Sequence, residues 1–267
     1  MTPIITIVTP VFNGMPWLPE TVQSVAAQRS DLGDQIEHII LDGGSTDGSR
    51  DWLAAHADLG FTLIAEPDEG QTDALAKGFD RATGDILGWL NADDLYEPGA
   101  LAAVRDAFAA NPDAVLVSGG CLLIDPDSVV TGSIPMPPVS TFAELLRFPT
   151  NLPQPATLFR AETYRAIGGL DRSYDLAMDV DLWMRLARQG SIVTMPDRTL
   201  ARFRLHPNAK SVAGITAAIR EDLRARRRAG LPPWSVAARY LAYHGYWRPL
   251  RAAVQARLSR RGLTDRS

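Results

Sequence analysis

The chain has 267 residues, of which 46% are hydrophobic and 22% are charged, and its formal net charge at pH 7 is −4. This composition is typical of a folded globular protein and excludes a largely disordered chain, while the single cysteine, Cys121, excludes an intrachain disulfide and favours a reducing, cytoplasmic location. We expect neither a signal peptide nor a membrane span, because no basic segment precedes an apolar stretch at the amino terminus and no run approaches the roughly 20 apolar residues that cross a bilayer.

Apolar, β-branched runs alternate with helix-like stretches over the first ninety residues. The runs predict buried parallel strands, and the stretches between them predict helices that begin near a Pro, Asp, Thr or Gly. Strands are expected at residues 4–9, 36–41, 61–65 and 86–90, and helices at 18–28, 47–57 and 72–82. This order implies right-handed crossovers and an α/β fold with one doubly wound, mostly parallel sheet and flanking helices.

The second half of the chain has a less regular pattern. Strands are expected at residues 114–118, 121–125, 129–133, 156–160 and 200–205, and helices at 141–148, 179–189 and 216–229. The Pro-rich stretch 134–139 is either a hinge or a loop over the site. No break in composition marks a second core, so we expect one domain over residues 1–215, followed by a helical, basic extension over residues 216–267.

The carboxyl-terminal extension differs in charge from the rest of the chain. Residues 221–267 contain 11 basic and 3 acidic side chains, a net charge of +8, whereas residues 1–220 carry −12. Together with five Trp and Tyr residues, this charge could hold the protein on an anionic membrane surface or bind an acidic partner. A solvated helical tail folded against the domain is the alternative.

Polar residues gather where the first four predicted strands end. The four strands lead into residues 10–14, 42–48, 66–71 and 91–94. In doubly wound sheets, ligands bind outside the carboxyl ends of the strands. The sequence therefore predicts a ligand site at this edge of the sheet.

Carboxylates follow the fourth predicted strand directly, in the sequence Leu90-Asn91-Ala92-Asp93-Asp94. Protein-bound Mg²⁺ usually takes one or two carboxylates together with substrate phosphates, so Asp93 and a diphosphate would suffice. The alternative is a turn, with Asp94 capping a helix near Pro98.

The loop after the second strand, Asp42 to Ser49, also has two interpretations. Its glycines can turn the chain while Asp47 caps the next helix, or Asp42 can accept hydrogen bonds from a base or ribose that approaches the glycine-rich backbone. It contains neither the dinucleotide fingerprint nor a P-loop, and this argues against both of those enzyme classes.

Taken together, these motifs resemble the family 2 glycosyltransferases of exopolysaccharide type, whose fold is called GT-A. The resemblance rests on TPVFNG, LDGGSTDGS, EPDEGQTDALAKG and LNADD at the four strand ends, and on GGLD followed by MDVDLWMRLA later in the chain. The motifs keep their order over residues 4–211. The resemblance implies an inverting, metal-dependent transfer of a sugar from a nucleoside-diphosphate sugar.

Site residues follow from this resemblance. It implies that the donor is bound by Thr9, Pro10, Asn13, Asp42, Asp73, Asn91, Ala92 and Asp93. It further implies Mg²⁺ or Mn²⁺ on Asp93, with Asn91 in place of the first aspartate of the family's DXD motif and with one negative charge fewer. The sequence also departs from the family at Leu75 and Ala76, where many relatives have an Arg-Asn pair.

Two further residues are implied in the second half of the chain. Asp179 matches the catalytic aspartate of the family, which accepts the proton of the attacking hydroxyl. His206 resembles a histidine of a loop that closes over the diphosphate, and we include it among the metal ligands. The alternatives are a helix start for Asp179 and Asp181, and an incidental histidine.

We therefore expect a transferase that acts on a glycan or lipid-linked acceptor in the synthesis of a surface polysaccharide or glycolipid, in the cytoplasm or at the inner face of the membrane, with no nucleic-acid partner. A catalytically silent nucleotide-sugar-binding protein is a second hypothesis, because Asn91 and Leu75 depart from the family. A sugar nucleotidyltransferase is a third, although residues 9–14 contain no Lys or Arg for a triphosphate loop.

Overall fold

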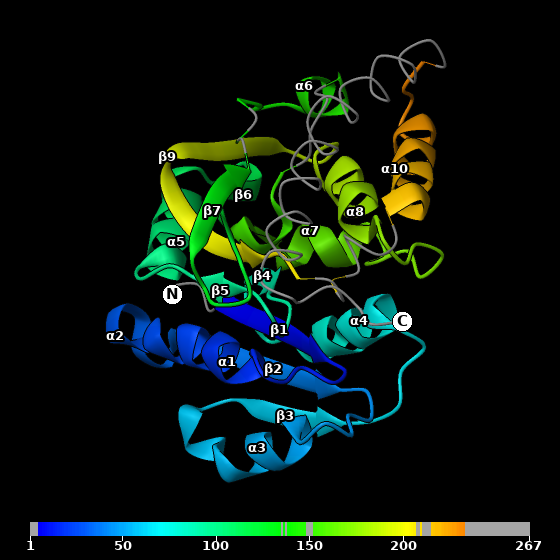
Figure 1. The fold of residues 1–267 in the computed structure, drawn as a ribbon. Coiled ribbons are helices and arrows are strands. Elements are labelled where there is room, and N and C mark those ends of the chain that lie inside the picture. Colours follow the sequence, from blue (N-terminus) through cyan, green and yellow to red (C-terminus); the bar gives the residue numbers. More distant parts are fainter. Residues whose placement is uncertain are drawn as a thin grey trace.

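The computed structural model describes residues 5–134, 136, 138–147, 152–206, 209 and 215–232. Its amino-terminal half contains four parallel strands, which lie in the order β3-β2-β1-β4 (Figure 1). These strands are β1 (Ile5–Val11), β2 (Ile36–Asp42), β3 (Thr62–Ala65) and β4 (Ile86–Trp89). The helices between them are α1 (Leu18–Ala27), the short α2 (Arg29–Leu32), α3 (Ser49–Ala55) and α4 (Gln71–Arg81), with 3-10 turns η1 (Gly33–Gln35) and η2 (Ala57–Leu59).

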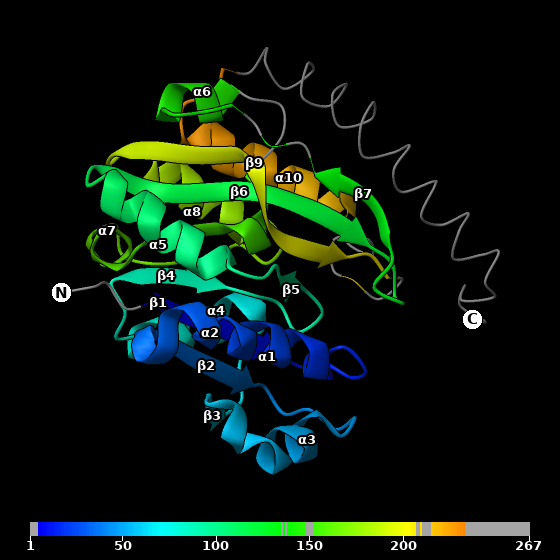
Figure 2. The same ribbon diagram turned by 90° about the vertical axis from the view of Figure 1, so that its left-hand side faces the viewer.

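The carboxyl-terminal half continues the same sheet with strands of both directions. Its strands are β5 (Leu95–Tyr96), β6 (Ala114–Ile124), β7 (Val130–Ile134), β8 (Thr157–Arg160) and β9 (Ser191–Arg204). Its helices are α5 (Ala100–Ala110), α6 (Phe142–Arg147), the 3-10 turn η3 (Gln154–Ala156), α7 (Ala161–Ala166), α8 (Met178–Leu186) and α10 (Ile215–Arg228). β8 runs antiparallel between β4 and β6, β6 pairs in parallel with β9, and β5 and β7 add antiparallel edges (Figure 2).

Alternation along β1 divides the core into two layers. Ile5 and Ile7 face a cluster with residues of α1 and α5, whereas Val8 faces α4 and α8 on the opposite side. Successive side chains of a strand point to opposite faces, so a strand buried on both sides reads as a continuous apolar run. The predicted α/β fold with a doubly wound, mostly parallel sheet is confirmed.

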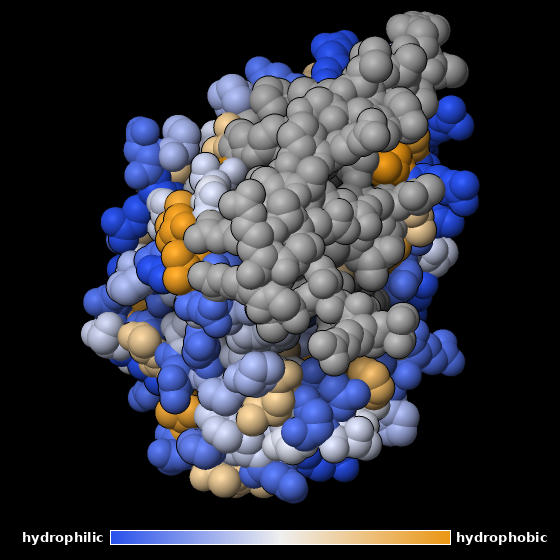
Figure 3. Space-filling model, viewed as in Figure 1, coloured by the Kyte–Doolittle hydropathy of each residue, from blue (hydrophilic) through white to orange (hydrophobic). Residues whose placement is uncertain are grey.

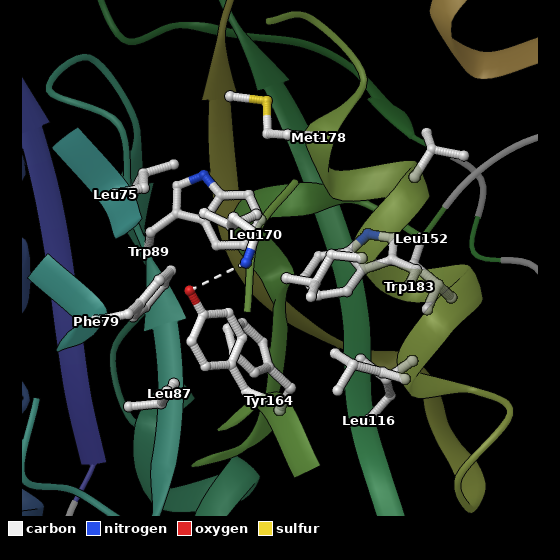
Figure 4. Packing of buried hydrophobic residues seen from close by; sticks show 14 of the residues in the cluster. Leu75, Phe79, Leu87, Trp89, Leu116, Leu152, Tyr164, Leu170, Met178 and Trp183 are labelled. Carbon is white, nitrogen blue, oxygen red and sulfur yellow. Dashed lines mark hydrogen bonds between the residues drawn. The ribbon is translucent and has the colours of Figure 1, made fainter. Parts of the chain in front are cut away.

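Aromatic packing fixes α8 on the sheet. The Trp89 ring at the end of β4 stacks on Trp183 of α8, with ring centroids 5.4 Å apart, and both side chains are buried. Phe79, Phe159 and Tyr164 surround the pair, and the Tyr164 hydroxyl accepts a hydrogen bond from the Leu170 amide (Figure 4). The helix that begins with Met178 therefore lies beside the strand that leads to Asn91.

Several predicted elements change their extent. The strands expected at 114–118 and 121–125 form the single strand β6, which passes through Gly119 and Gly120 with a shift in register against β9. A Cβ at Gly119 would lie 2.8 Å from the Arg198 carbonyl, so glycine lets the two strands approach. β9 begins nine residues before the expected start, and the helices α5 and α7 were not predicted.

The expected helix 216–229 is α10, which lies beside α8 (Figure 1). The rest of the predicted extension, from residue 233 on, lies outside the described residues. Within the described residues, no helix is both long and apolar enough to cross a bilayer. The described part of one face is mostly hydrophilic, with apolar residues in small separate groups (Figure 3).

Candidate active site

Hydrogen bonds join the loops that follow β1 and β2. The Asn13 amide donates to Ser45 Oγ at 2.9 Å, and Asn13 Oδ1 accepts from the Thr46 amide at 2.8 Å. The Met15 amide donates to the Asp47 carboxylate at 2.8 Å. Asn13 has a positive φ of 55°, which asparagine tolerates better than most residues. Asn13 thus lies at the predicted edge and fixes the two loops together.

Asp42 is fully buried at the end of β2. Its Oδ1 accepts the Ser45 amide at 3.0 Å, and its Oδ2 lies 2.7 Å from both Nε and Nη2 of Arg50. Burial raises the pKa of the Asp42 carboxyl, but the hydrogen bonds from Ser45 and Arg50 and the Arg50 charge outweigh burial and bring the pKa below its usual range. The carboxylate is therefore ionised and held in place, and its contact with a base stays a prediction.

Thr9 and Pro10 lie near the end of β1, paired with β2. The Thr9 side chain is fully buried, and its hydroxyl lies 2.9 Å from His38 Nε2. Burial, with a smaller effect of Arg29, lowers the pKa of His38 to about 3, so the ring is neutral. The Thr9 hydroxyl thus faces inward, and any contact of Thr9 with a nucleotide would use its backbone. Pro10 is partly exposed at the same edge.

The loop after β3 lies against the loop after β2. A Cβ on Gly43 would lie 2.1 Å from Asp68 Oδ2, so a larger residue at position 43 would have to displace the Asp68 carboxylate. The predicted donor residue Asp73, in the first turn of α4, binds Lys77 at 2.7 Å and Arg172 at 3.4 Å. Asp73 therefore connects α4 to the loop before α8, and its contact with the donor stays a prediction.

Asn91 lies at the centre of an amide network after β4. Its Oδ1 accepts from Gln71 Nε2 at 2.7 Å, and its Nδ2 donates to Asp94 at 3.2 Å and to Gln154 at 3.1 Å. Gln154 in turn donates to the Trp89 carbonyl at 2.8 Å. The network holds Asn91 in a fixed orientation with one lone pair of Oδ1 occupied. The role of Asn91 as a metal ligand, and that of its partly exposed neighbour Ala92 in donor binding, stay predictions.

Asp93 and His206 meet although 113 residues separate them in the chain. Asp93 Oδ2 and His206 Nε2 are 2.8 Å apart, with 25% of the Asp93 side chain and 8% of the His206 side chain exposed. Nδ1 of His206 is buried and has no hydrogen-bond partner among the described residues. β9 ends at Arg204, two residues before His206, and this places the imidazole over the loop that follows β4.

Arg204 fixes the other side of this pair. Its fully buried guanidinium donates to the Asp93 carbonyl at 2.8 Å and to Glu20 of α1 at 2.9 Å. Its backbone amide donates to Asp94 Oδ1 at 2.9 Å. Asp94 therefore binds β9 and does not cap α5, and burial, followed by the Asp93 charge, raises the pKa of the Asp94 carboxyl well above its usual range.

The Asp93 and His206 pair suits a divalent cation. A carboxylate oxygen and an imidazole nitrogen that lie side by side can both bind one ion, and part of the Asp93 side chain is open to solvent for further oxygen ligands. No group of three or more His, Cys, Asp or Glu side chains suited to a metal occurs among the residues that the structure describes. Among the described residues, the Asn91 oxygen is a further candidate ligand, and substrate or water oxygens could complete the coordination.

Asp179 and Asp181 lie in the first turn of α8 but have different surroundings. Asp181 is buried and forms an ion pair with Arg185 at 2.7 Å. Asp179 is partly buried, and its Oδ1 accepts the amide of Val180 at 2.8 Å. Burial, followed by the charge of Asp222, raises the pKa of Asp179 to about 6, against the opposing effects of the Val180 amide and the Arg226 charge. The Asp179 carboxyl can therefore exchange a proton near neutral pH.

Comparison with known proteins identifies the family. Residues 6–148 match the family described as Glycosyl transferase family 2. A PGL/p-HBAD biosynthesis glycosyltransferase of Mycobacterium bovis is 31% identical over 196 residues, which are 72% of this chain and 73% of the relative. An uncharacterized glycosyltransferase of Mycobacterium tuberculosis is also 31% identical over 196 residues, 72% of each chain. The chain belongs to glycosyltransferase family 2.

Solved structures share the GT-A fold of this transferase. Residues 1–349 of TarS from S. aureus, in complex with UDP-GlcNAc, give a TM-score of 0.69 at 12% identity, over 91% of this chain and 73% of that chain. The mannosyltransferase PcManGT from Pyrobaculum calidifontis, in complex with GDP-Man and Mn²⁺, gives 0.58 at 23% identity, over 99% of this chain and 82% of that chain.

The structure adds candidate site residues that sequence reasoning missed. Phe12 is 69% exposed at the end of β1, directly before Asn13, where an aromatic face is open to a base. Trp17 packs on the His206 ring, with centroids 4.2 Å apart, and lies under the Arg204 guanidinium. An exposed aromatic inside TPVFNG was a signal for Phe12, whereas no local pattern connects Trp17 or Arg204 to residues so distant in the chain.

Proposed function

We propose that this family 2 member is an inverting glycosyltransferase that moves a sugar from a nucleoside-diphosphate sugar to an acceptor hydroxyl, with Asp179 as the general base. The observation that carries the proposal is the contrast between Asp179 and Asp181. The Asp181 carboxylate is taken by Arg185, whereas Asp179 is free of basic partners at hydrogen-bond distance among the described residues and has a raised pKa. A base works best when its pKa lies near the working pH.

The donor would lie along the edge that the first four strands form. Phe12 and Pro10 would border the base, and Asn13, Asp42 and the glycine-rich loop would bind the base and ribose. Stacking of a base on an aromatic ring contributes roughly 1–3 kcal/mol in nucleic-acid complexes. The donor-bound relatives in fold, TarS with UDP-GlcNAc and PcManGT with GDP-Man, support a sugar nucleotide as the donor class.

A divalent cation, Mg²⁺ or Mn²⁺, would be held by Asp93 and His206, with Asn91 as a further candidate. When bound, such an ion stabilises the negative charge of the leaving diphosphate. The Mn²⁺ in the PcManGT structure supports this cofactor. We expect Asp93→Ala to abolish transfer and to remove any effect of Mn²⁺ on nucleoside-diphosphate affinity in calorimetry. Full activity of the wild-type enzyme in excess chelator would contradict the metal site.

On the opposite face of the sugar, Asp179 would accept the proton of the acceptor hydroxyl as that oxygen attacks the anomeric carbon. The carbon–diphosphate bond breaks as the new glycosidic bond forms, so the configuration inverts. The PGL/p-HBAD relative supports an acceptor in glycolipid or surface polysaccharide synthesis.

The test compares Asp179→Asn with Asp181→Asn in single-turnover transfer. Because an amide cannot accept the acceptor's proton, Asp179→Asn should lower the transfer rate at least about 100-fold while donor affinity stays nearly unchanged. Near-wild-type transfer by Asp179→Asn, with loss of transfer in Asp181→Asn, would move the base to Asp181. Donor binding without turnover by the wild-type protein would instead favour a silent binding protein.

We also propose peripheral contact with an anionic membrane through the basic carboxyl-terminal region. Within the described residues, Arg220 and Arg227 of α10 are exposed, whereas Arg224 and Arg228, although also exposed, bind Ser173 and Asp171. Clustered basic residues near an anionic surface contribute about 1 kcal/mol each.

A further inference from the structure

The segment of residues 171–177 leads into the helix that carries Asp179, and two separate helices hold it. On one side, the Thr72 hydroxyl of α4 donates to the Tyr174 carbonyl at 2.7 Å. On the other side, Arg224 of α10 donates to the Ser173 carbonyl at 2.7 Å, and its guanidinium lies 3.9 Å from the centroid of the Tyr174 ring. The position of α8 therefore depends on both helices.

One carboxylate oxygen of Glu221 accepts three backbone hydrogen bonds from this segment. A single oxygen, Oε2, accepts the amides of Asp175, Leu176 and Ala177 at 3.1, 2.8 and 3.0 Å. These amides come from three successive residues directly before α8. Because Glu221 belongs to α10, it reaches them from 44 to 46 residues further along the chain.

A helix start needs such an acceptor. The first amides of an α-helix have no partner within the helix, and a side chain of the N-cap residue usually accepts one of them. Here the N-cap residue is Ala177, which has no polar side chain. A carboxylate at this end also interacts favourably with the helix dipole. Glu221 accepts the amide of this N-cap residue and the amides of the two residues before it, so a carboxylate from another helix holds the entry into α8.

α10 holds Glu221 in a fixed place. Arg226 of α10 is fully buried, binds Asp222 at 2.9 Å and donates to the Leu145 carbonyl of α6 at 3.0 Å. Arg228 binds Asp171 at 2.7 Å, at the start of the same segment. These contacts fix the position of α10 against α6 and the 171–177 segment. The Glu221 carboxylate is therefore held in a fixed position relative to the three amides.

We infer that Glu221 is a positioning residue for sugar transfer, which holds the first turn of α8 so that the Asp179 carboxylate faces the reacting hydroxyl. This inference rests on the proposed role of Asp179 as the base. Glu221 comes from a different helix and is not expected to contact the reacting atoms. Its loss should therefore affect the transfer step and not donor binding.

The experiment uses the full chain with three variants. Glu221→Ala removes the acceptor, whereas Glu221→Gln keeps an amide oxygen that can accept the same three amides. Glu144→Ala is the matched control, because Glu144 Oε2 also accepts three donors, the amides of Ser140 and Thr141 and the Ser140 hydroxyl, beside the start of α6. Each variant is assayed for donor affinity, thermal midpoint, single-turnover transfer and the pH dependence of transfer.

We expect Glu221→Ala to lower the transfer rate at least about 10-fold with donor affinity unchanged, since a displacement of about 1 Å at a reacting group can cost on the order of 100-fold. The acid limb, which is the fall of the transfer rate at low pH, should move to lower pH in this variant. The reason is that a frayed first turn hydrates Asp179 while Asp222 and Arg226 of α10 stay in place. Glu221→Gln should recover most of the rate, and Glu144→Ala should lose stability with no change in rate or acid limb.

Asp179→Asn, measured in parallel, separates the two proposals. If Asp179→Asn loses transfer while Glu221→Ala keeps the wild-type rate and acid limb, the inference about Glu221 is overturned and the base stands. If Asp179→Asn keeps its rate, both are overturned. Should Glu221→Ala fail to fold, Glu221→Asp replaces it: this carboxylate is one methylene too short for the three amides, and wild-type transfer by it would equally refute the positioning role.

Discussion

Asp179 combines burial with nearby charges of both signs, and this combination sets when it can act as a base. Burial and Asp222 raise its pKa to about 6, and Arg226 opposes them. Below that pH the carboxyl is protonated and cannot accept a proton from an acceptor hydroxyl. The transfer rate should therefore rise with pH through about 6 and then level off.

The charge of Asp222 provides a direct test of this pH dependence. Asp222→Asn removes a negative charge and leaves Arg226 in place, so the pKa of Asp179 should fall and the acid limb of the rate should move to lower pH. Asp106→Asn, on the exposed side of α5, is the control and should leave the limb unchanged. Single-turnover rates from pH 4.5 to about 8 measure both. An unshifted limb in Asp222→Asn would show that another group titrates.

The raised pKa of Asp179 also predicts a cost in stability. In the unfolded chain the carboxyl loses its proton near its ordinary value of 3.8, whereas in the folded protein it keeps the proton until about pH 6. The free energy of unfolding should therefore fall between about pH 4 and 6 and stay reduced at higher pH, by at most about 3 kcal/mol, at about 1.4 kcal/mol per pKa unit.

Asp179→Asn carries no such penalty. At pH 8 this variant should be more stable than the wild type in urea unfolding, and the difference should shrink as the pH falls from about 6 to about 4. Equal stability of the two proteins at pH 8 would show that the Asp179 carboxylate is well solvated.

At the scale of elements, the loops after β2 and β3 approach closely at Gly43. Gly43→Ala places a methyl group against the Asp68 carboxylate, which is itself held by the Gly70 amide at 2.8 Å. Overpacking of this kind costs typically 1–3 kcal/mol. We expect Gly43→Ala to lower the thermal midpoint and to weaken nucleoside-diphosphate binding.

The double variant Gly43→Ala, Asp68→Ala gives the decisive comparison. Removing the Asp68 carboxylate makes room for the methyl group, so the double variant should be more stable and bind more tightly than Gly43→Ala alone. Additive losses in calorimetry and thermal unfolding would mean that the two loops do not share this contact.

The elements that the sequence predicts well are those with a local cause. The four parallel strands and the helices between them follow from continuous apolar runs and helix-opening residues, and their bounds agree within a few residues. The extent of β9 does not follow, because residues 191–199 pair with β6 through a shifted register that no local pattern records. α5 does have a local signal, because its apolar residues Leu101, Val104 and Phe108 recur at helical spacing.

At the scale of the whole molecule, charge is divided between two ends of the chain. The acidic body carries −12 over residues 1–220 and the basic region carries +8. Such a distribution would orient the protein at an anionic membrane, with α10 toward the lipid. α10 also directs Glu221 and Asp222 inward, so one helix would serve both the membrane and the base.

Vesicle sedimentation at low salt tests this orientation. The protein should bind vesicles that contain anionic lipid more than neutral ones, and raised salt should weaken the difference, because the Debye length falls from about 10 Å at 0.1 M to about 3 Å at 1 M. The variant Arg220→Gln, Arg227→Gln should bind anionic vesicles less than the wild type. Equal binding to both kinds of vesicle would refute an electrostatic contact.

The candidate site shows which of its parts a sequence can predict. The convergence of Asn13, Asp42 and Asn91 at one edge follows from strand order alone, since the carboxyl ends of parallel strands meet there. The partners of the site residues do not follow, because Gln154 reaches Asn91, Arg204 reaches Asp93, and Glu221 reaches the residues before α8, all from distant elements. Thr9 illustrates the limit: its position was predicted, but its hydroxyl faces inward to His38.

A chimaera of two family members could be made to exchange their acceptor preference. Whether such a chimaera keeps its contacts intact depends on where the two sequences are joined. The family match ends at residue 148, and a junction there would look natural. It would separate Asp73 from Arg172 and Thr72 from Tyr174, which tie the two halves together. A chimaera that takes residues 152–232 from a relative should therefore also take that relative's residues at positions 72 and 73, so that the segment leading into the imported helix α8 keeps both of its contacts with α4.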